Sequence, residues 1–254
     1  MSLEPSLLTQ APTLRNCLEA FLVVLVLTQL VPQALLVPPA YWLFWIRGVR
    51  GVERIQSGSL FKGQLRHEIS YSLLSAVVYS AVIVAALAGW RLGAFPKFYL
   101  HPAENGWPYF ALSIAATLGV QDLLFYPLHR LLHSRAFVSM HAIHHRSKIP
   151  TPFAFNSFHP IEAIFQILHV PVAMALFRVS PAALFISVCV VSNTLNVYGH
   201  LNFAPRMPEW LSRHWSRFAC ISPFHSLHHA RFRGNYGLYS ALWDRLFGTA
   251  IDSK

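Results

Sequence analysis

The stretch HRLLHSRAFVSMHAIHH, residues 129–145, holds five histidines, and a related stretch, HSLHH, follows at 225–229. His129 and His133 are four residues apart, so a helix places both on one face. The HxxHH motifs at 141–145 and 225–229 have the i, i+3, i+4 spacing, which also shares a helical face. Imidazole groups suit iron, zinc, copper or nickel better than magnesium or calcium. We therefore expect these segments to meet at a metal centre rather than to be solvated or capping histidines.

The composition around these motifs is that of a membrane protein. Of the 254 residues, 54% are hydrophobic and only 12% are charged, whereas soluble domains carry about 25% charged residues. The net charge of +10 fits loops rich in Lys and Arg on the cytoplasmic side of a membrane. No basic stripe of the kind that binds nucleic acid is apparent, so that function class is disfavoured.

Apolar runs predict the membrane segments. Three long runs cover 18–46, 69–90 and 108–127, and each approaches or exceeds the roughly 20 residues of a spanning helix. Pro32, Pro38 and Pro39 interrupt the first run, which predicts one kinked helix or a broken one. Residues 161–178 and 181–199 form two further apolar segments, and the turn residues between them predict a hairpin.

This layout brings the histidine motifs to one side of the membrane. If 108–127 crosses once and the hairpin goes out and returns, residues 129–159, His200 and 225–229 all lie on the same side. The basic loop 47–68 falls there too, together with Arg130, Arg135, Arg146 and Lys148. The positive-inside rule makes that side cytoplasmic. The predicted fold is an all-α integral membrane protein with four to five membrane-embedded helices and a cytosolic, histidine-rich helical cap.

The number of histidines favours two metal ions. A single zinc site needs about four ligands, and more candidates than that lie in or beside the motifs: His129, His133, His141, His144, His145, His200, His225, His228 and His229. We rank iron above zinc because of this count and the lipid setting, while zinc stays an alternative. The HExxH motif of common zinc proteases and the GxSxG motif of serine hydrolases are absent from the sequence. The GxGxxG dinucleotide-binding motif is absent too, so a redox reaction would take electrons from a separate carrier.

Four further polar residues are candidates for supporting roles. Asn196 precedes His200 by four residues and is either a weak ligand, an outer donor or a packing amide. Asp122 lies two helical turns before His129 and is expected to fix a histidine tautomer, or to be a carboxylate at the membrane interface. His159 is a candidate for the substrate path, for metal binding or for helix capping. His169, inside an apolar segment, is expected to be packed or to line a tunnel.

At these residues the chain resembles the fatty acid hydroxylase/sterol desaturase superfamily. FYPLHRLLH, HAIHH and HSLHH are similar to its histidine boxes, and NYGLYSALWDRLFGT, at 235–249, is similar to its C-terminal signature. PTPFAFNSFHPIEA is most similar to the C-5 sterol desaturase branch. The resemblance extends over roughly half the chain and implies one membrane domain over 1–254, with the histidine-box core at about 115–250.

The resemblance implies an oxidoreductase that uses two iron ions, O2 and two electrons to desaturate or hydroxylate a lipid or sterol. It implies that the nine histidines named above are the ligands, and that cytochrome b5, a ferredoxin or a reductase supplies electrons. The host membrane would be a bacterial inner membrane or the endoplasmic reticulum. Two rivals stay open: a zinc-dependent membrane lipid hydrolase, and a metal carrier, which would place histidines within the spans.

Overall fold

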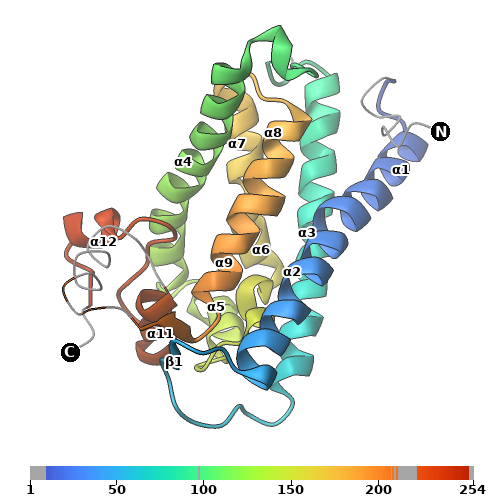
Figure 1. Ribbon diagram of the computed structural model, residues 1–254. Helices are drawn as coiled ribbons and strands as arrows, with labels where there is room; N and C mark the ends of the chain where they lie inside the picture. The colour runs from blue at the N-terminus through green and yellow to red at the C-terminus, as the bar shows by residue number, and fades with distance from the viewer. Residues whose placement is uncertain (1–9, 97, 207, 209, 211–221, 252–254) are drawn as a thin grey trace.

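Long helices running side by side form the body of the protein (Figure 1). The computed structural model describes residues 10–96, 98–206, 208, 210 and 222–251. Four of its helical segments are long and apolar enough to cross a membrane: Leu14–Arg47, Gln64–Arg91, Trp107–Leu132 and Pro181–Gly199. A fifth apolar segment, Pro160–Leu176, is shorter. The expectation of an all-α membrane protein with four to five embedded helices is confirmed.

The first span is one continuous helix despite its prolines. It runs through α1 (Leu14–Val24), η2 (Leu25–Leu30), α2 (Val31–Tyr41) and η3 (Trp42–Arg47). Pro38 and Pro39 lie inside α2, and η2 and η3 are π-helical. A π-helical turn changes the hydrogen-bond spacing and so accommodates residues that lack an N–H donor. The 34 residues rise about 51 Å, which exceeds the ~30 Å hydrocarbon core.

The predicted hairpin has a short first leg. It consists of α6 (Pro160–Ile167) and α7 (His169–Leu176), with Leu168 between them. Ser180 then caps α8 (Pro181–Phe185) by accepting a hydrogen bond from the Ala183 N–H, and the return leg continues through η6 (Ile186–Ser192) and α9 (Asn193–Gly199). Tyr79 of α3 (Gln64–Arg91) packs with α6 and α7 in the main apolar cluster. The short leg therefore lies inside the helical body.

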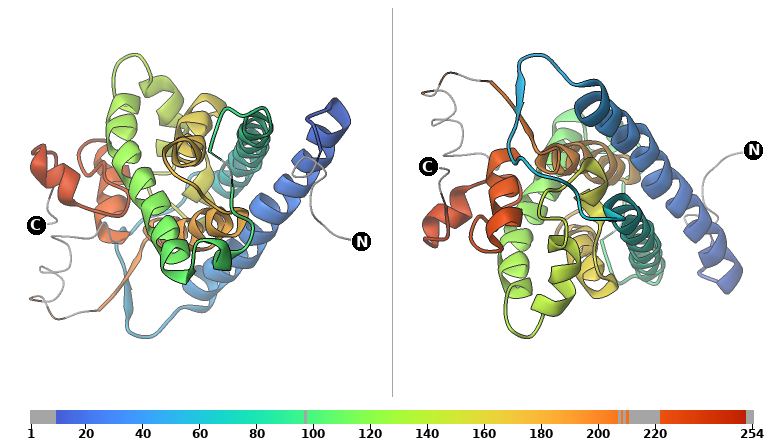
Figure 2. Two further views of the ribbon diagram at one scale, coloured as in Figure 1. Left: turned by 90° about the horizontal axis from the view of Figure 1, so that it is seen from above. Right: turned by 90° about the horizontal axis from the view of Figure 1, so that it is seen from below.

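The ends of the membrane helices carry a small cap on one side. It contains α5 (Val138–His145), η5 (Pro152–Asn156), α11 (Ser222–Arg231) and α12 (Leu242–Leu246) next to the end of α4 (Trp107–Leu132). The strands β1 (Val52–Arg54) and β2 (Phe203–Pro205) pair antiparallel with Glu53 opposite Ala204, which fixes the loop after the first span to the segment after α9. The short helix η4 (Pro102–Glu104) lies in the connection between α3 and α4, near the opposite end (Figures 1 and 2).

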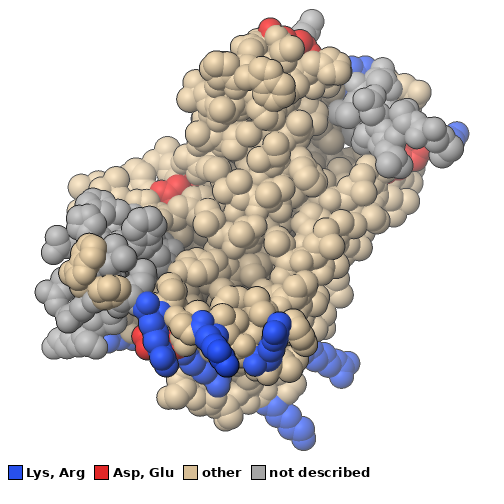
Figure 3. Space-filling model, viewed as in Figure 1, with Lys and Arg blue, Asp and Glu red and all other residues tan. Residues whose placement is uncertain are grey.

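Charge is distributed unevenly along the long axis. Basic side chains gather at the end that carries β1 and α11, while the visible flank of the helices is mostly uncharged (Figure 3). The basic residues expected on the side of the histidines are all exposed: Arg47, Arg50, Arg54, Lys62, Arg66, Arg130, Arg135, Arg146 and Lys148. Large apolar side chains such as Leu35, Leu112 and Leu123 are exposed along the helices, as expected for surfaces that face lipid rather than water.

Candidate metal centre

Two groups of histidines lie next to each other where the helical body meets the cap. The ligand atoms within each group lie within 4.8 Å of one another. The first group contains His129, His133, His141, His145 and His228; the second contains His144, His200, His225 and His229. All nine histidines singled out in the sequence are thus brought together by α4, α5, α11 and the end of α9. Whether they bind metal is not tested by this arrangement and stays a prediction.

Each HxxHH motif contributes to both groups. In α5, His141 and His145 belong to the first group and His144 to the second. In α11, His225 and His229 belong to the second group and His228 to the first. Residues four apart on a helix differ by about 40° in direction, whereas adjacent residues differ by about 100°. Adjacent histidines of one helix can therefore belong to two neighbouring ligand groups.

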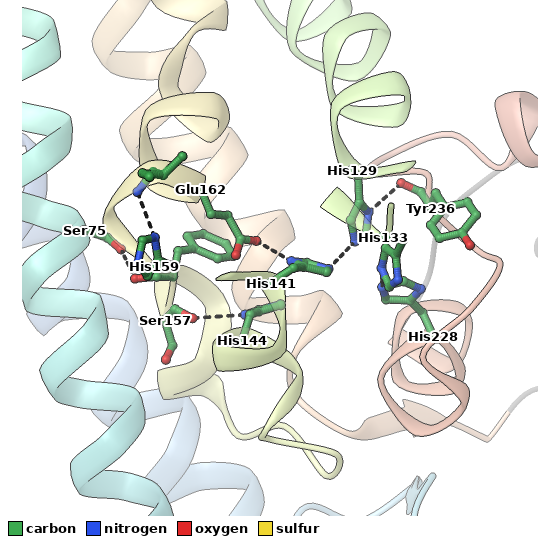
Figure 4. A network of polar contacts seen from close by, with 12 residues as sticks. Ser75, His129, His133, His141, His144, Ser157, His159, Glu162, His228 and Tyr236 are labelled. Carbon is green, nitrogen blue, oxygen red and sulfur yellow. Dashed lines mark hydrogen bonds and ion pairs between the residues drawn. The ribbon is translucent and has the colours of Figure 1, made fainter. Parts of the chain in front are cut away.

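Main-chain carbonyl groups fix the orientation of most of the rings. The Nδ1 atoms of His129 and His228 donate to the carbonyl oxygens of Tyr236 and Gly234 at 2.9 and 2.6 Å. The same arrangement holds His144 on Ser157, His200 on Asn196 and His229 on Ser147. A carbonyl oxygen can only accept, so Nδ1 carries the proton and Nε2 presents a lone pair. Figure 4 shows part of this network.

The distances between Nε2 atoms fit a bound cation. His129 and His141 approach to 3.2 Å and His133 and His228 to 3.3 Å in the first group. In the second group His225 lies 3.0 Å from His200 and 3.1 Å from His229. Where both rings carry their proton on Nδ1, two facing Nε2 atoms have no hydrogen to share and their lone pairs repel. A cation with nitrogen ligands at 2.0–2.1 Å separates them by about 3.3 Å.

His145 provides a second observation that fits a bound metal ion. The residue is 5% exposed, and neither of its ring nitrogens has a hydrogen-bond partner among the described residues. A buried polar group without a partner costs free energy. Its ring lies 5.1 Å from that of His133 and 4.5 Å from that of His228. A metal ion bound by the first group would supply the missing partner.

Burial keeps the histidines of the cap neutral. It is the main cause that lowers the pKa of His144, His145, His225, His228 and His229 well below 6.5, and the neighbouring histidines lower it further. Burial likewise lowers the pKa of His133 to about 3 and that of His200 to about 4. Neutral imidazole is the form that binds metal. At pH 7 no proton has to leave these rings before a cation can bind.

Two carboxylates that the sequence analysis missed support the site. Glu162, fully buried on α6, accepts from His141 Nδ1 at 2.7 Å (Figure 4), which is the carboxylate–histidine arrangement common behind metal ligands. Asp244 accepts from the N–H groups of Tyr236 and Gly237 at 2.8 and 2.6 Å and so holds the loop whose carbonyls orient His129 and His228. A carboxylate in an apolar segment was the available signal for Glu162.

Asp122 contacts the C-terminal segment and not a histidine. Its oxygens accept from the N–H groups of Tyr239 and Ser240 and from Trp243 Nε1 at 2.9, 3.2 and 2.8 Å, and among the described residues it bonds to no histidine. The expected tautomer-fixing contact is therefore not the one the structure shows. The reason is that residues 239–243 return to α4 more than 100 positions later in the chain, which local spacing does not reveal.

Asn196 and His159 have supporting positions. The main-chain carbonyl of Asn196 orients His200, while its side chain donates to Ser192 Oγ at 3.3 Å. His159 caps α6 by accepting from the Ile161 N–H at 3.2 Å, which is the capping alternative considered for it. Neither residue belongs to the two histidine groups. Their role in metal binding stays a prediction.

A cavity of about 50 Å³ lies beside both histidine groups. Its walls include His129 and His141 of the first group and His144, His200 and His225 of the second. The opposite wall comes from α3, α4, α6, α7 and α9, so the cavity extends from the histidines into the helical body. Phe155 lines this cavity and also a larger, mainly apolar groove of about 290 Å³ between α2 and α3. The candidate centre therefore faces a space inside the membrane part.

Comparisons with known proteins match the region of the chain that contains these residues. The model of the fatty acid hydroxylase family matches residues 114–249. Lathosterol oxidases of mouse and human are 33% and 32% identical over 194 and 193 residues, 74% of this chain. The Delta(7)-sterol 5(6)-desaturase of Eremothecium gossypii is 32% identical over 194 residues, again 74% of this chain and 52% of that protein.

The chain spans 62% of the length of the mouse and human relatives. No solved structure matches it. The family model covers more than half of the chain, including all nine histidines and the segment of Glu162 and Asp244. The chain therefore belongs to the fatty acid hydroxylase family, and the relatives it resembles are sterol C-5 desaturases.

Proposed function

We propose that this protein is an iron-dependent membrane oxidoreductase that uses O2 and two electrons to desaturate or hydroxylate a lipid. The observation that carries the proposal is the pair of buried histidine groups, whose Nε2 atoms face one another at the end of a cavity between membrane helices. The names of the relatives, lathosterol oxidase and Delta(7)-sterol 5(6)-desaturase, support a sterol-like substrate.

Two iron ions would be held by the nine histidines, five in one group and four in the other. When bound, such a pair supplies the oxidising power that cleaves an unactivated C–H bond. Desaturation removes two hydrogens and, with O2, two electrons and two protons, yields two waters. Hydroxylation inserts one oxygen atom and yields one water. Which outcome follows depends on how the cavity places the substrate, because small differences in position change the reacting bond.

The chain's own residues have three tasks in this reaction. Carbonyl groups of Tyr236, Gly234 and Asn196 keep Nε2 of their histidines free and directed inward. Glu162 makes His141 a stronger donor to a cation by accepting its Nδ1 proton in a hydrogen bond. The packed helices around the cavity exclude water, which protects a strong oxidant from side reactions.

Electrons would come from a separate carrier on the side of the cap, which we place in the cytoplasm. Arginines and lysines form a basic surface at that end (Figure 3). Arg130, Arg135 and Arg146, which lie next to the histidine motifs in the sequence, are exposed. Such a surface attracts an acidic electron carrier and raises its association rate at low salt. It also satisfies the positive-inside rule. The proposed carrier is cytochrome b5, a ferredoxin or a reductase.

The test combines metal analysis with lipid profiling. The purified protein is expected to contain iron, and cells with the intact gene should contain an O2-dependent lipid product that deletion removes. His144→Ala should lose that product, because the residue belongs to the second histidine group. His101→Ala, an exposed position at the opposite end, should keep it. Zinc with an O2-independent product would favour the hydrolase instead, and an unchanged lipid profile would contradict the oxidoreductase.

A further inference from the structure

A stripe of buried polar side chains runs along α3, the second membrane span. Gln64, Glu68, Ser72 and Ser75 follow one another at intervals of four, four and three residues, which places them on one face of the helix. None of them is more than 5% exposed. Polar side chains are costly in the interior of a membrane protein unless they are hydrogen-bonded. Their contacts therefore indicate why they are there.

The stripe bonds to the segment that follows the first HxxHH motif, residues 147–158. Glu68 accepts from the hydroxyl of Thr151, whose oxygen in turn accepts from the Phe153 N–H at the start of η5. Gln64 donates to Glu68 and to the carbonyl oxygen of Ile149, both at 2.8 Å. Two serines further along α3 donate to main-chain carbonyl groups of the same segment: Ser72 to Phe153 and Ser75 to Phe158, at 2.9 and 3.5 Å.

Glu68 has no charged partner in this contact. Among the described residues it forms no ion pair, so hydrogen bonds compensate for its burial. Its two oxygens receive different donors, Oε1 from Gln64 and Oε2 from Thr151. Without the carboxylate both donors lose this acceptor, and the bond between α3 and Thr151 is lost. Glu68 therefore joins Gln64 and Thr151 and fixes the segment to α3.

The same segment supplies the carbonyl groups that orient two rings of the second histidine group. His144 donates from Nδ1 to the Ser157 carbonyl oxygen at 3.3 Å (Figure 4), and His229 donates to that of Ser147 at 3.0 Å. Ser147 lies four residues before Thr151, and Ser157 directly follows η5, the helix that Thr151 caps. Rings of the first group are held by other partners: Tyr236, Gly234 and Glu162.

We propose that Glu68 is a positioning residue for the second histidine group and acts through residues 147–157. The inference rests on the metal centre of the proposed function. Loss of the Thr151 contact lets the segment shift, and the carbonyl groups that hold His144 and His229 shift with it. A metal-binding ring is directed by the hydrogen bond on its other nitrogen. The second group should then bind a cation more weakly, while the first group keeps its affinity.

Titration of the metal-free protein with Co(II), in detergent and without turnover, tests the proposal. Imidazole binds Co(II) well, and wild type is expected to bind two ions per chain. Glu68→Gln should weaken one of the two sites about tenfold, the lower end for loss of a group behind a metal ligand. Ser80→Ala is the matched control and should keep both affinities, because Ser80 is equally buried on α3 but bonds to the Ala76 carbonyl of the same helix.

Two histidine backgrounds identify which site Glu68 affects. His133→Ala removes a ligand of the first group, so the tight site that is left is the second, and adding Glu68→Gln should weaken it about tenfold. His225→Ala removes a ligand of the second group, so the tight site that is left is the first. Adding Glu68→Gln to this background should leave its Co(II) affinity unchanged.

Substitutions at Thr151 test the contact itself and do not require a Glu68 variant to fold. Thr151→Val removes the hydroxyl that donates to Glu68 and should also weaken the second site about tenfold. Thr151→Ser keeps the hydroxyl and should keep the wild-type affinity. A residue with only a structural role would lower the unfolding midpoint without distinguishing between the two sites.

Unchanged affinities in Glu68→Gln and Thr151→Val, or equal weakening of both sites, would overturn the proposal. Weakening of the isolated first site in His225→Ala would overturn it too, and so would a wild type that binds fewer than two ions. The titration requires neither O2 nor a product. A protein that binds Co(II) in the expected pattern but forms no O2-dependent lipid product would contradict the proposed function alone.

Discussion

Replacing Glu162 by Gln tests whether the buried carboxylate tunes the metal centre. Oε1 of Glu162 lies 2.7 Å from His141 Nδ1, and the side chains are 0% and 1% exposed, so solvent hardly screens the contact. Gln keeps the shape and an acceptor oxygen but removes the negative charge. A hydrogen bond to a charged group contributes about 1.5–3 kcal/mol, and loss of a carboxylate behind a metal-binding histidine costs about 10–100-fold in affinity or activity.

The expected result is therefore Fe(II) binding weakened about 10–100-fold, with product formation reduced at least as much. The affinity is measured by competition with a chelator on metal-free protein in detergent. Thermal unfolding of the metal-free variant provides the check on folding. Its midpoint should be unchanged or higher, because a buried charge has been removed and Glu162 Oε2 has no partner among the described residues.

Glu53→Gln is the matched control, because Glu53 is an exposed residue of β1 and its replacement should leave Fe(II) affinity unchanged. An affinity of Glu162→Gln within twofold of wild type would refute the reasoning. A lower unfolding midpoint of the metal-free variant would show instead that Glu162 acts through folding rather than through His141.

Three other perturbations follow from the same contacts. Asp122→Asn should lower the unfolding free energy by about 2 kcal/mol, because three donors of residues 239–243 lose a charged acceptor; limited proteolysis of the C-terminal segment should become faster, and an unchanged rate would contradict this. Gly234→Ala should reduce bound iron. The φ of Gly234 is +65° and the new Cβ would lie 2.7 Å from the Thr249 carbonyl oxygen, which would displace the Gly234 carbonyl that holds His228. The control Gly248→Ala, at φ +67° in open space, should cost only backbone strain of about 1–2 kcal/mol. The metal-free protein should lose stability as the pH falls below 6.5. The folded state lowers the pKa of His133 to about 3 and that of His200 to about 4, so the unfolded chain binds protons first and each such histidine contributes a slope of about 1.4 kcal/mol per pH unit. A melting temperature that stays constant from pH 7 to 5 would be inconsistent with this prediction.

The membrane helices and the meeting of the histidines could be predicted because both depend on local patterns. Apolar runs indicate the spans directly, and their alternation determines which motifs share a side. The division of the histidines into two groups was also contained in the spacing. In α5 and in α11 the residues four apart join one group and the residue between them joins the other, as the 100° rotation per residue requires.

The supporting contacts could not be predicted because they depend on the path of the main chain. Tyr236 orients the ring of His129, 107 positions earlier, and Gly234 orients that of His228 across a turn, both through carbonyl groups that every residue possesses. Asp122 bonds to residues 239–243 for the same reason, and its position two turns before His129 suggested a partner that it does not contact. The continuity of the first helix through Pro38 and Pro39 depends on π-helical turns, which leave no clear signature in the sequence.

The arrangement of the rings links the folding of the cap to the cation that we propose. Histidines from α4, α5, α9 and α11 face one another with Nε2 atoms 3.0–3.4 Å apart, while carbonyl groups hold the protons on the opposite side. In the pairs His129–His141 and His144–His200 both rings hold their proton on Nδ1. Without a cation the facing lone pairs of these pairs repel and the buried acceptors stay unpaired. These costs fall most heavily on α5 and α11, since each contributes three histidines that are divided between the two groups. Binding of cations would therefore stabilise the packing of the cap on the helical body. The stability of the cap would then depend on whether the site holds metal.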